Sequence, residues 1–260
     1  MILPGLVSIT FRQLTPREII ILAQRAGLCG IEWGGDIHVP HGDLTRAREV
    51  RQLTADHGLK VSAYGSYYRL AKSESEGLAF PMVLDTAVAL GAPTIRIWAG
   101  VAGSAEVDLH KRVQLIEETR RIADLASTVQ ITISFEYHGD TLTDTNDSAL
   151  QLMQEINHPN VLSFWQPPNG KEIDYCLDGL QGILPWLSCI HLFHWWPDGG
   201  TLLPLSEGKD RWHRYLELVR STGRDHFACL EFVKGDHPET FLADVATLHQ
   251  WLREDVETVL

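Results

Sequence analysis

Residues 131–141 read ITISFEYHGDT, an apolar, β-branched run that passes directly into Glu136 and His138. The run has the composition of a buried β-strand. Because side chains alternate along a strand, Glu136 and His138 would point to the same side of it. A carboxylate and an imidazole at the end of a buried strand indicate a site that uses both.

An apolar run that ends in polar residues recurs along the whole chain. Amphipathic segments with a helical period separate these runs. The first segment has Thr15 and Glu18 at capping-box spacing, Pro16 at its first position and Gly27 at its end. The last has one apolar face, formed by Phe241, Leu242, Val245, Leu248, Trp251 and Leu252. The predicted strands are residues 5–10, 30–33, 59–64, 94–98, 131–136, 161–165, 189–194 and 227–233.

Eight strand–helix units in 260 residues predict one (β/α)8 TIM barrel, an α/β fold that spans residues 1–260 as a single domain. No linker or composition break divides the chain. The runner-up is a doubly wound sheet, which more often carries a glycine-rich phosphate turn after its first strand. Here the first run ends in Ser8-Ile9-Thr10-Phe11, without a GxGxxG or Walker A motif.

Composition excludes several classes of protein. The formal net charge is −12, which disfavours nucleic acid and anionic membranes as partners. The sequence shows no signal peptide and no apolar run long enough to span a bilayer. The four cysteines form no CxxC pair, so we read them as small buried hydrophobes in a reduced compartment. We therefore expect a cytoplasmic globular protein.

Polar side chains stand at the ends of seven of the eight predicted strands. Reactive groups of TIM barrels lie at the carboxyl ends of the strands. A single polar residue there is more often a loop anchor or a helix cap than a ligand, and Arg96, between Ile95 and Ile97, fits a structural role as well as a substrate role. The set is Glu32, Tyr64, Arg96, Trp98, Glu136, His138, Trp165, Gln166, His191, His194, Glu231 and Lys234.

Three residues of this set favour a cation site. Glu136 and Glu231 each follow an apolar run, where an unpaired carboxylate is unfavourable, and His191 lies inside one. Two carboxylates and an imidazole at one barrel mouth are suitable ligands for a divalent cation. Such a cation would offset the repulsion between the carboxylates and polarise a carbonyl or alkoxide oxygen.

The chain resembles the xylose isomerase-like TIM barrels, a superfamily of sugar isomerases and epimerases that also includes the type IV apurinic endonucleases. The resemblance is strongest in SFEYHGDT, LSFWQPPNG, CIHLFHW and CLEFVKGD, at residues 134–141, 162–170, 189–195 and 229–236. It implies one divalent cation, often Mn²⁺, Mg²⁺ or Co²⁺, with Zn²⁺ as a further candidate. Its implied ligands are Glu136, Gln166, His191 and Glu231.

Two positions depart from the family pattern. Gln166 stands where the family usually has Asp, so the shell would hold two carboxylates instead of three and bind its cation less tightly. The phase of this strand is also open: either Gln166 faces the ion, or Trp165 is the pocket residue and stacks on substrate. The second departure is His194, at a position where related epimerases often have an acidic residue.

Four functions follow from these residues. The first is an isomerase or epimerase of a small keto-sugar or polyol, with Glu136 and Glu231 as its acid/base pair. The second is a dehydratase of an inosose- or dehydroshikimate-like substrate at the same site. The third is a binding barrel without metal. A nuclease is disfavoured, because it needs a multi-zinc site and a basic track.

The remaining pocket assignments concern the substrate. His138, Arg96 and Lys234 would hold substrate oxygens, and Tyr64 and Glu32 would complete the polar rim together with Trp98 and His194. The partner would be a small carbohydrate, with neither nucleic acid nor membrane involved. A homodimer or homotetramer is compatible with the sequence.

Overall fold

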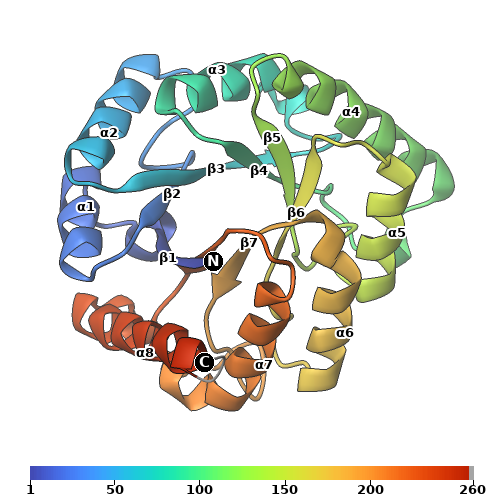
Figure 1. Cartoon of the computed structure of the whole chain (residues 1–260). Coiled ribbons are helices and arrows are strands. Elements are labelled where there is room, and N and C mark those ends of the chain that lie inside the picture. The colour runs from blue at the N-terminus through green and yellow to red at the C-terminus, as the bar shows by residue number, and fades with distance from the viewer. Residues whose placement is uncertain (258–260) are drawn as a thin grey trace.

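A computed structural model shows a closed barrel of eight parallel strands surrounded by eight helices, and it describes residues 1–257. Each strand pairs with the next one along the chain, and β8 closes the ring on β1 (Figure 1). The predicted (β/α)8 fold is confirmed. The strands are β1 Ile2–Val7, β2 Gly30–Gly34, β3 Lys60–Arg69, β4 Thr94–Trp98, β5 Thr132–Glu136, β6 Val161–Trp165, β7 Leu187–Leu192 and β8 His226–Leu230.

The helices form the outer layer, and their caps explain where they begin. Thr15 accepts a hydrogen bond from Glu18 N–H and the Glu18 side chain accepts from Thr15 N–H, so the predicted capping box is confirmed. The apolar face of the last helix is also confirmed, because Phe241 is fully buried. The helices are α1 Pro16–Arg25, α2 Leu44–Asp56, α3 Phe80–Leu90, α4 Leu109–Ser127, α5 Asn146–Ile156, α6 Ile173–Ile183, α7 Lys209–Arg220 and α8 Pro238–Glu257.

Four predicted strands, which correspond to β1, β3, β7 and β8, were placed with limits wrong by two residues or more. β7 begins and ends two residues earlier than predicted, and β8 ends three residues earlier. β1 begins at Ile2, three residues earlier than predicted, and Pro4 does not interrupt it. Pro4 points toward β2 at a level where β2 has not yet begun, so the missing N–H of Pro4 costs the sheet no hydrogen bond. β3 continues five residues beyond the predicted end at Tyr64. A register shift after Gly65 and a positive φ of 54° at Tyr67 carry it to Arg69.

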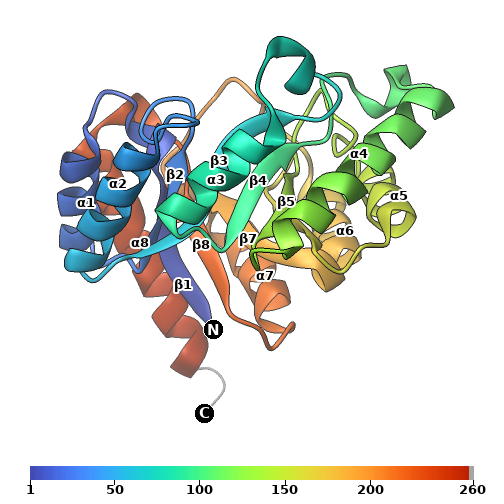
Figure 2. The same ribbon diagram turned by 90° about the horizontal axis from the view of Figure 1, so that it is seen from above.

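The carboxyl ends of all eight strands meet at one end of the barrel, opposite the N-terminus (Figure 2). Small and apolar side chains, among them Ala63, Phe164, Cys189 and Cys229, fill the interior below this mouth. A larger apolar layer lies between the strands and the helices. In the part of the chain that the structure describes, no helix combines the length and apolarity that a membrane crossing requires.

Candidate active site

A cavity of about 290 Å³ opens at the mouth of the barrel. This volume is near the lower end of the range for small-molecule pockets. Six of the predicted site residues line it: Arg96, Trp98, Glu136, His138, Gln166 and Glu231. They come from β4, β5 and the segments that follow β5, β6 and β8, so the fold brings together residues up to 135 positions apart.

Three buried side chains at this mouth could hold a metal ion. Glu136 ends β5, His191 lies on β7 and Glu231 directly follows β8. One ligand atom from each lies within 4.8 Å of the others, and all three residues are buried. His191 Nδ1 lies 3.2 Å from a carboxylate oxygen of Glu231.

Gln166 joins this group, because its side-chain oxygen lies 3.1 Å from His191 Nδ1. The phase left open by the sequence is set by an irregular register between Ser163 and Phe164 of β6. Phe164 meets the His191 ring edge-on at a centroid distance of 5.3 Å, whereas Trp165 packs on Tyr215 of α7 at 5.1 Å. Trp165 is fully buried away from the cavity, so the prediction that it stacks on substrate is wrong.

Beneath the cavity lies a buried ionic network. Arg96 donates from Nε to Glu32 at 2.5 Å and from Nη1 to Glu136, and His191 Nε2 lies 2.9 Å from Glu32. Burial alone would raise the pKa of Glu32, but Arg96 and His191 outweigh it and lower that pKa to about 2. Gly65 leaves room for this network, since a Cβ there would lie 2.7 Å from Glu32 and 2.8 Å from Arg96.

The charge of this network fits a divalent cation. Burial would lower the pKa of His191, but Glu231 and Glu32 raise it well above its usual value in the metal-free protein. Three carboxylates then face one guanidinium and one imidazolium, a net charge of −1. A divalent cation that replaced the imidazolium proton would bring the sum to zero. The donor set of carboxylates, imidazole and amide oxygen also suits such a cation.

Trp98 and His138 form an aromatic wall of the cavity. Trp98 Nε1 donates to Glu136 at 2.5 Å, and the His138 ring stacks on Trp98 with centroids 4.5 Å apart. His138 Nδ1 lies 2.6 Å from the carbonyl oxygen of Gly139. This geometry makes Nδ1 the donor, so Nε2 is free to accept a proton.

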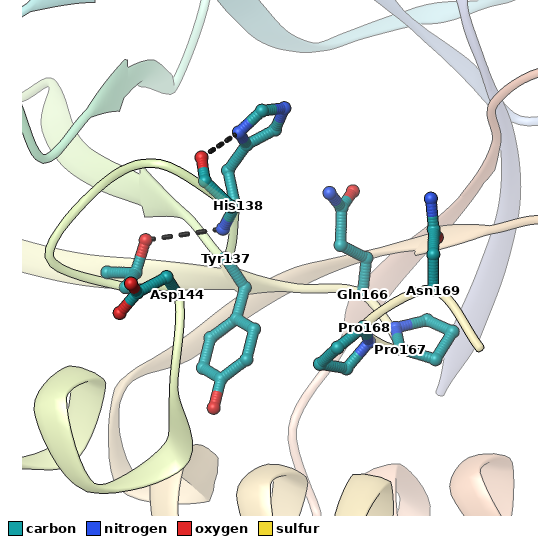
Figure 3. Close-up of a pocket in the computed structure, with 9 residues that line it drawn as sticks. Tyr137, His138, Asp144, Gln166, Pro167, Pro168 and Asn169 are labelled. Atoms are coloured by element: carbon teal, nitrogen blue, oxygen red, sulfur yellow. Dashed lines mark hydrogen bonds between the residues drawn. The ribbon is translucent and has the colours of Figure 1, made fainter. Parts of the chain in front are cut away.

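A second cavity of about 270 Å³ adjoins the first between the segments that follow β5 and β6. His138, Gln166 and Asn169 line both cavities. In Figure 3 the side chains of His138 and Gln166 point to the same side, whereas the Tyr137 ring points away from them. The space available to a ligand therefore extends past His138 and Gln166.

Besides Trp165, four predicted substrate-binding residues lie outside both cavities. Tyr64 is fully buried and donates its hydroxyl hydrogen to the Val39 carbonyl at 2.9 Å, because β3 continues past it. Glu32 lies beneath the mouth cavity. His194 is buried beside Gly208 and Trp212 of the α7 region, and Lys234 is exposed in the turn after β8. None of these four residues lines either cavity, so their assignment to substrate binding stays a prediction.

Sequence reasoning missed several residues of the mouth. Arg12 follows β1 through a short 3₁₀ turn and pairs with Asp36, and its Nη2 lies 3.4 Å from the Tyr67 hydroxyl. Arg12 carries the same signal as the residues predicted at the other strand ends, because it is a polar residue that directly follows an apolar run. Tyr67 was hidden by the underestimated length of β3. The residues missed are Ile9, Arg12, Tyr67, Asn169, Phe193, Trp195 and Phe232.

A family model described as the xylose isomerase-like TIM barrel matches residues 20–255. The chain belongs to the xylose isomerase-like TIM barrel family. The resemblance seen in the sequence is thereby confirmed.

Relatives of this xylose isomerase-like barrel have different named activities. A 3-dehydroshikimate dehydratase from Bacillus anthracis is 26% identical over 94% of this chain and 95% of its own. The crystal structure of a probable 3-dehydroshikimate dehydratase from the same organism has a TM-score of 0.79 and 24% identity over 94% of this chain and 98% of its own.

Two further structures share the fold. A D-psicose 3-epimerase from Clostridium cellulolyticum H10, solved with D-tagatose, has a TM-score of 0.76 and 12% identity, and covers 97% of this chain and 98% of its own. A Mycobacterium smegmatis member solved with magnesium has a TM-score of 0.71 and 20% identity, and covers 93% of this chain and 90% of its own. At these identities the likeness concerns the fold alone.

Proposed function

We propose that this protein is a metal-dependent enzyme that removes a proton α to a carbonyl group of a small hydroxylated ketone. The first candidate reaction is dehydration of a cyclic keto acid of the 3-dehydroshikimate kind. The observation that carries the proposal is the buried group of Glu136, His191 and Glu231, of which the two carboxylate residues line a small-molecule cavity. The dehydratase relative supports the choice of reaction.

Glu136, His191 and Glu231, with Gln166, would hold the cation. When bound, a divalent cation acts as a Lewis acid that polarises a carbonyl oxygen and so acidifies the neighbouring C–H bond. The magnesium-bound family member supports a divalent cation in this fold. Arg96 and Trp98 both donate to Oε2 of Glu136, which leaves Oε1 to face the cation.

His138 is the proposed general base of the dehydration. Its Nδ1 is occupied by the Gly139 carbonyl and its ring is held on Trp98, so Nε2 faces the cavity as a proton acceptor. Nε2 takes the α-proton, and the electron pair forms a C=C bond as the β-hydroxyl leaves. The same imidazole returns the proton to that hydroxyl, and one water molecule is released per substrate.

Arg12 is the proposed partner of the substrate carboxylate. It lies on the wall of the mouth cavity with about half of its side chain exposed, so it can turn from Asp36 to a ligand. Arg96, the other arginine that lines the cavity, already forms ion pairs with Glu32 and Glu136. A neutral ketose would not need Arg12.

The second candidate is epimerisation or isomerisation of a ketose. Glu136 and Glu231 come from strands on different sides of the barrel and meet at one cation-binding position, which supports them as an acid/base pair. One carboxylate would take the α-proton, and the other would return a proton to the opposite face or to the neighbouring carbon. This candidate requires no general base at His138.

The test is to incubate the manganese-loaded protein with 3-dehydroshikimate and, separately, with D-fructose, D-psicose and D-tagatose. Dehydration predicts an aromatic 3,4-dihydroxybenzoate product, seen by ultraviolet absorbance and lost in His138→Asn. Epimerisation predicts interconversion of the ketoses that His138→Asn retains and Glu231→Gln loses. If the manganese-saturated protein turns over none of these compounds and exchanges none of their α-protons with solvent, the proposal is wrong.

A further inference from the structure

His191 has a partner at each ring nitrogen, although it is fully buried. Nε2 lies 2.9 Å from Glu32 Oε2. Nδ1 lies 3.1 Å from Gln166 Oε1 and 3.2 Å from Glu231 Oε2. The two nitrogens therefore face different groups: Nδ1 faces the proposed ligands of the cation, and Nε2 faces a carboxylate that does not line the cavity.

Glu32 can act only as a hydrogen-bond acceptor toward Nε2 of His191. An ionised carboxylate accepts hydrogen bonds and cannot donate them, so it requires a proton on Nε2. Glu32 has no exposed surface, and its other oxygen accepts from Arg96 Nε at 2.5 Å. It can neither turn to solvent nor move away without breaking this second contact.

We infer that Glu32 is a positioning residue that keeps the Nε2 proton on His191 and aims the bare Nδ1 at the cation. A metal-bound histidine whose other nitrogen donates to a carboxylate has a fixed tautomer and ring orientation. Arg96 extends the arrangement, because the same guanidinium that anchors Glu32 also donates to Glu136. One buried ion-pair network thus orients two of the proposed ligands.

Two variants distinguish the effect of the position of the Glu32 carboxylate from the effect of its charge. Glu32→Gln removes the charge and can present an NH₂ group to Nε2, which would move the histidine proton to Nδ1. Glu32→Asp keeps the charge but shortens the side chain, so it no longer reaches Nε2 while Arg96 holds it. The matched control is Glu118→Gln. Like Glu32, Glu118 has a hydrogen-bond partner at each carboxylate oxygen, a tyrosine hydroxyl at 2.8 Å and a backbone N–H at 2.7 Å, but it does not line the mouth cavity or contact the proposed ligands.

The experiment is calorimetric titration of each metal-free, folded protein with Mn²⁺. We expect roughly 10–100-fold weaker binding in both Glu32 variants, the usual effect of losing such a partner, and unchanged binding in Glu118→Gln. Weakening in Glu32→Gln alone would indicate an effect of charge and would overturn the inference, as would unchanged binding in both.

A second measurement reads the tautomer directly. In the Zn²⁺-loaded, ¹⁵N-histidine-labelled protein, the His191 signals, assigned by their absence in His191→Gln, should show a proton on Nε2 and none on Nδ1. Any other tautomer in the native protein would overturn the inference. The inference rests on the cation site of the proposed function but not on its substrate. Failure of the native protein to bind Mn²⁺ would contradict the proposed function, whereas equal binding by native and Glu32 variants contradicts only the role of Glu32.

Discussion

Replacing Arg96 by methionine should destabilise the metal-free protein strongly. Arg96 is 1% exposed and donates to both Glu32 and Glu136. Methionine fills much of the same volume but leaves the carboxylates of Glu32 and Glu136 buried without the guanidinium that pairs with them. The net charge of the network falls from −1 to −2, so the carboxylates also repel one another without compensation.

Removal of one partner from a buried ion pair costs about 3–5 kcal/mol. For a domain of this size about 2 °C of melting temperature corresponds to each kcal/mol, so Arg96→Met should melt about 6–10 °C below the native protein. Differential scanning calorimetry in EDTA at neutral pH measures this shift. Added Mn²⁺ should restore part of it, because a cation neutralises the same carboxylates.

The matched control is Arg69→Met. Arg69 is half-buried at the end of β3, with its guanidinium over the Trp98 ring at 5.2 Å, and forms no ion pair among the described residues. It should lower the free energy of unfolding by about 1 kcal/mol or less. If Arg96→Met melts no lower than Arg69→Met, Arg96 does not compensate the buried carboxylates, and the reasoning is refuted.

Three further predictions concern single positions. Gln166→Asp adds a negative charge beside His191 and should tighten Mn²⁺ binding in a calorimetric titration; unchanged affinity would mean that Gln166 does not face the ion. His138→Asn should lower the turnover of 3-dehydroshikimate by about 10²–10⁴-fold without changing the melting temperature, as expected for loss of a general base. Burial raises the pKa of Asp244 from 3.8 to about 6, although the Leu205 N–H lowers it. The folded protein then holds a proton that the unfolded chain has lost between these values, so stability should fall as pH rises through this range. Asp244→Asn lacks this titration, so the free energy of unfolding of the variant minus that of the native protein should be larger at pH 7 than at pH 4. Calorimetry at both pH values measures this difference, and an equal difference at the two would contradict the assignment.

The sequence predicted the order of strands and helices because that order depends on local pattern. The limits of β4 and β6 were predicted correctly, since each is a short apolar run bounded by turn residues. The error at β3 arose because its extension depends on a register shift after Gly65 and a positive φ at Tyr67. Neither feature has a signature in local composition.

The three central residues, Glu136, His191 and Glu231, could be predicted because each is a charged or polar residue in or beside an apolar run. The side to which Trp165 and Gln166 point could not, because it depends on how β6 pairs with β7. The position of Glu32 beneath the mouth cavity was equally hidden. It results from long-range contacts with Arg96 and His191 that only the closed barrel creates.

The measurement that tests the central claim most directly is an anomalous difference map from crystals of this protein soaked in Mn²⁺. The account predicts one strong peak coordinated by Glu136, Glu231 and His191 Nδ1, with the Gln166 side-chain oxygen directed toward it and Glu32 still bonded to Nε2. A strong peak at another location, or none in crystals soaked at a concentration that saturates the protein in solution, would contradict the account.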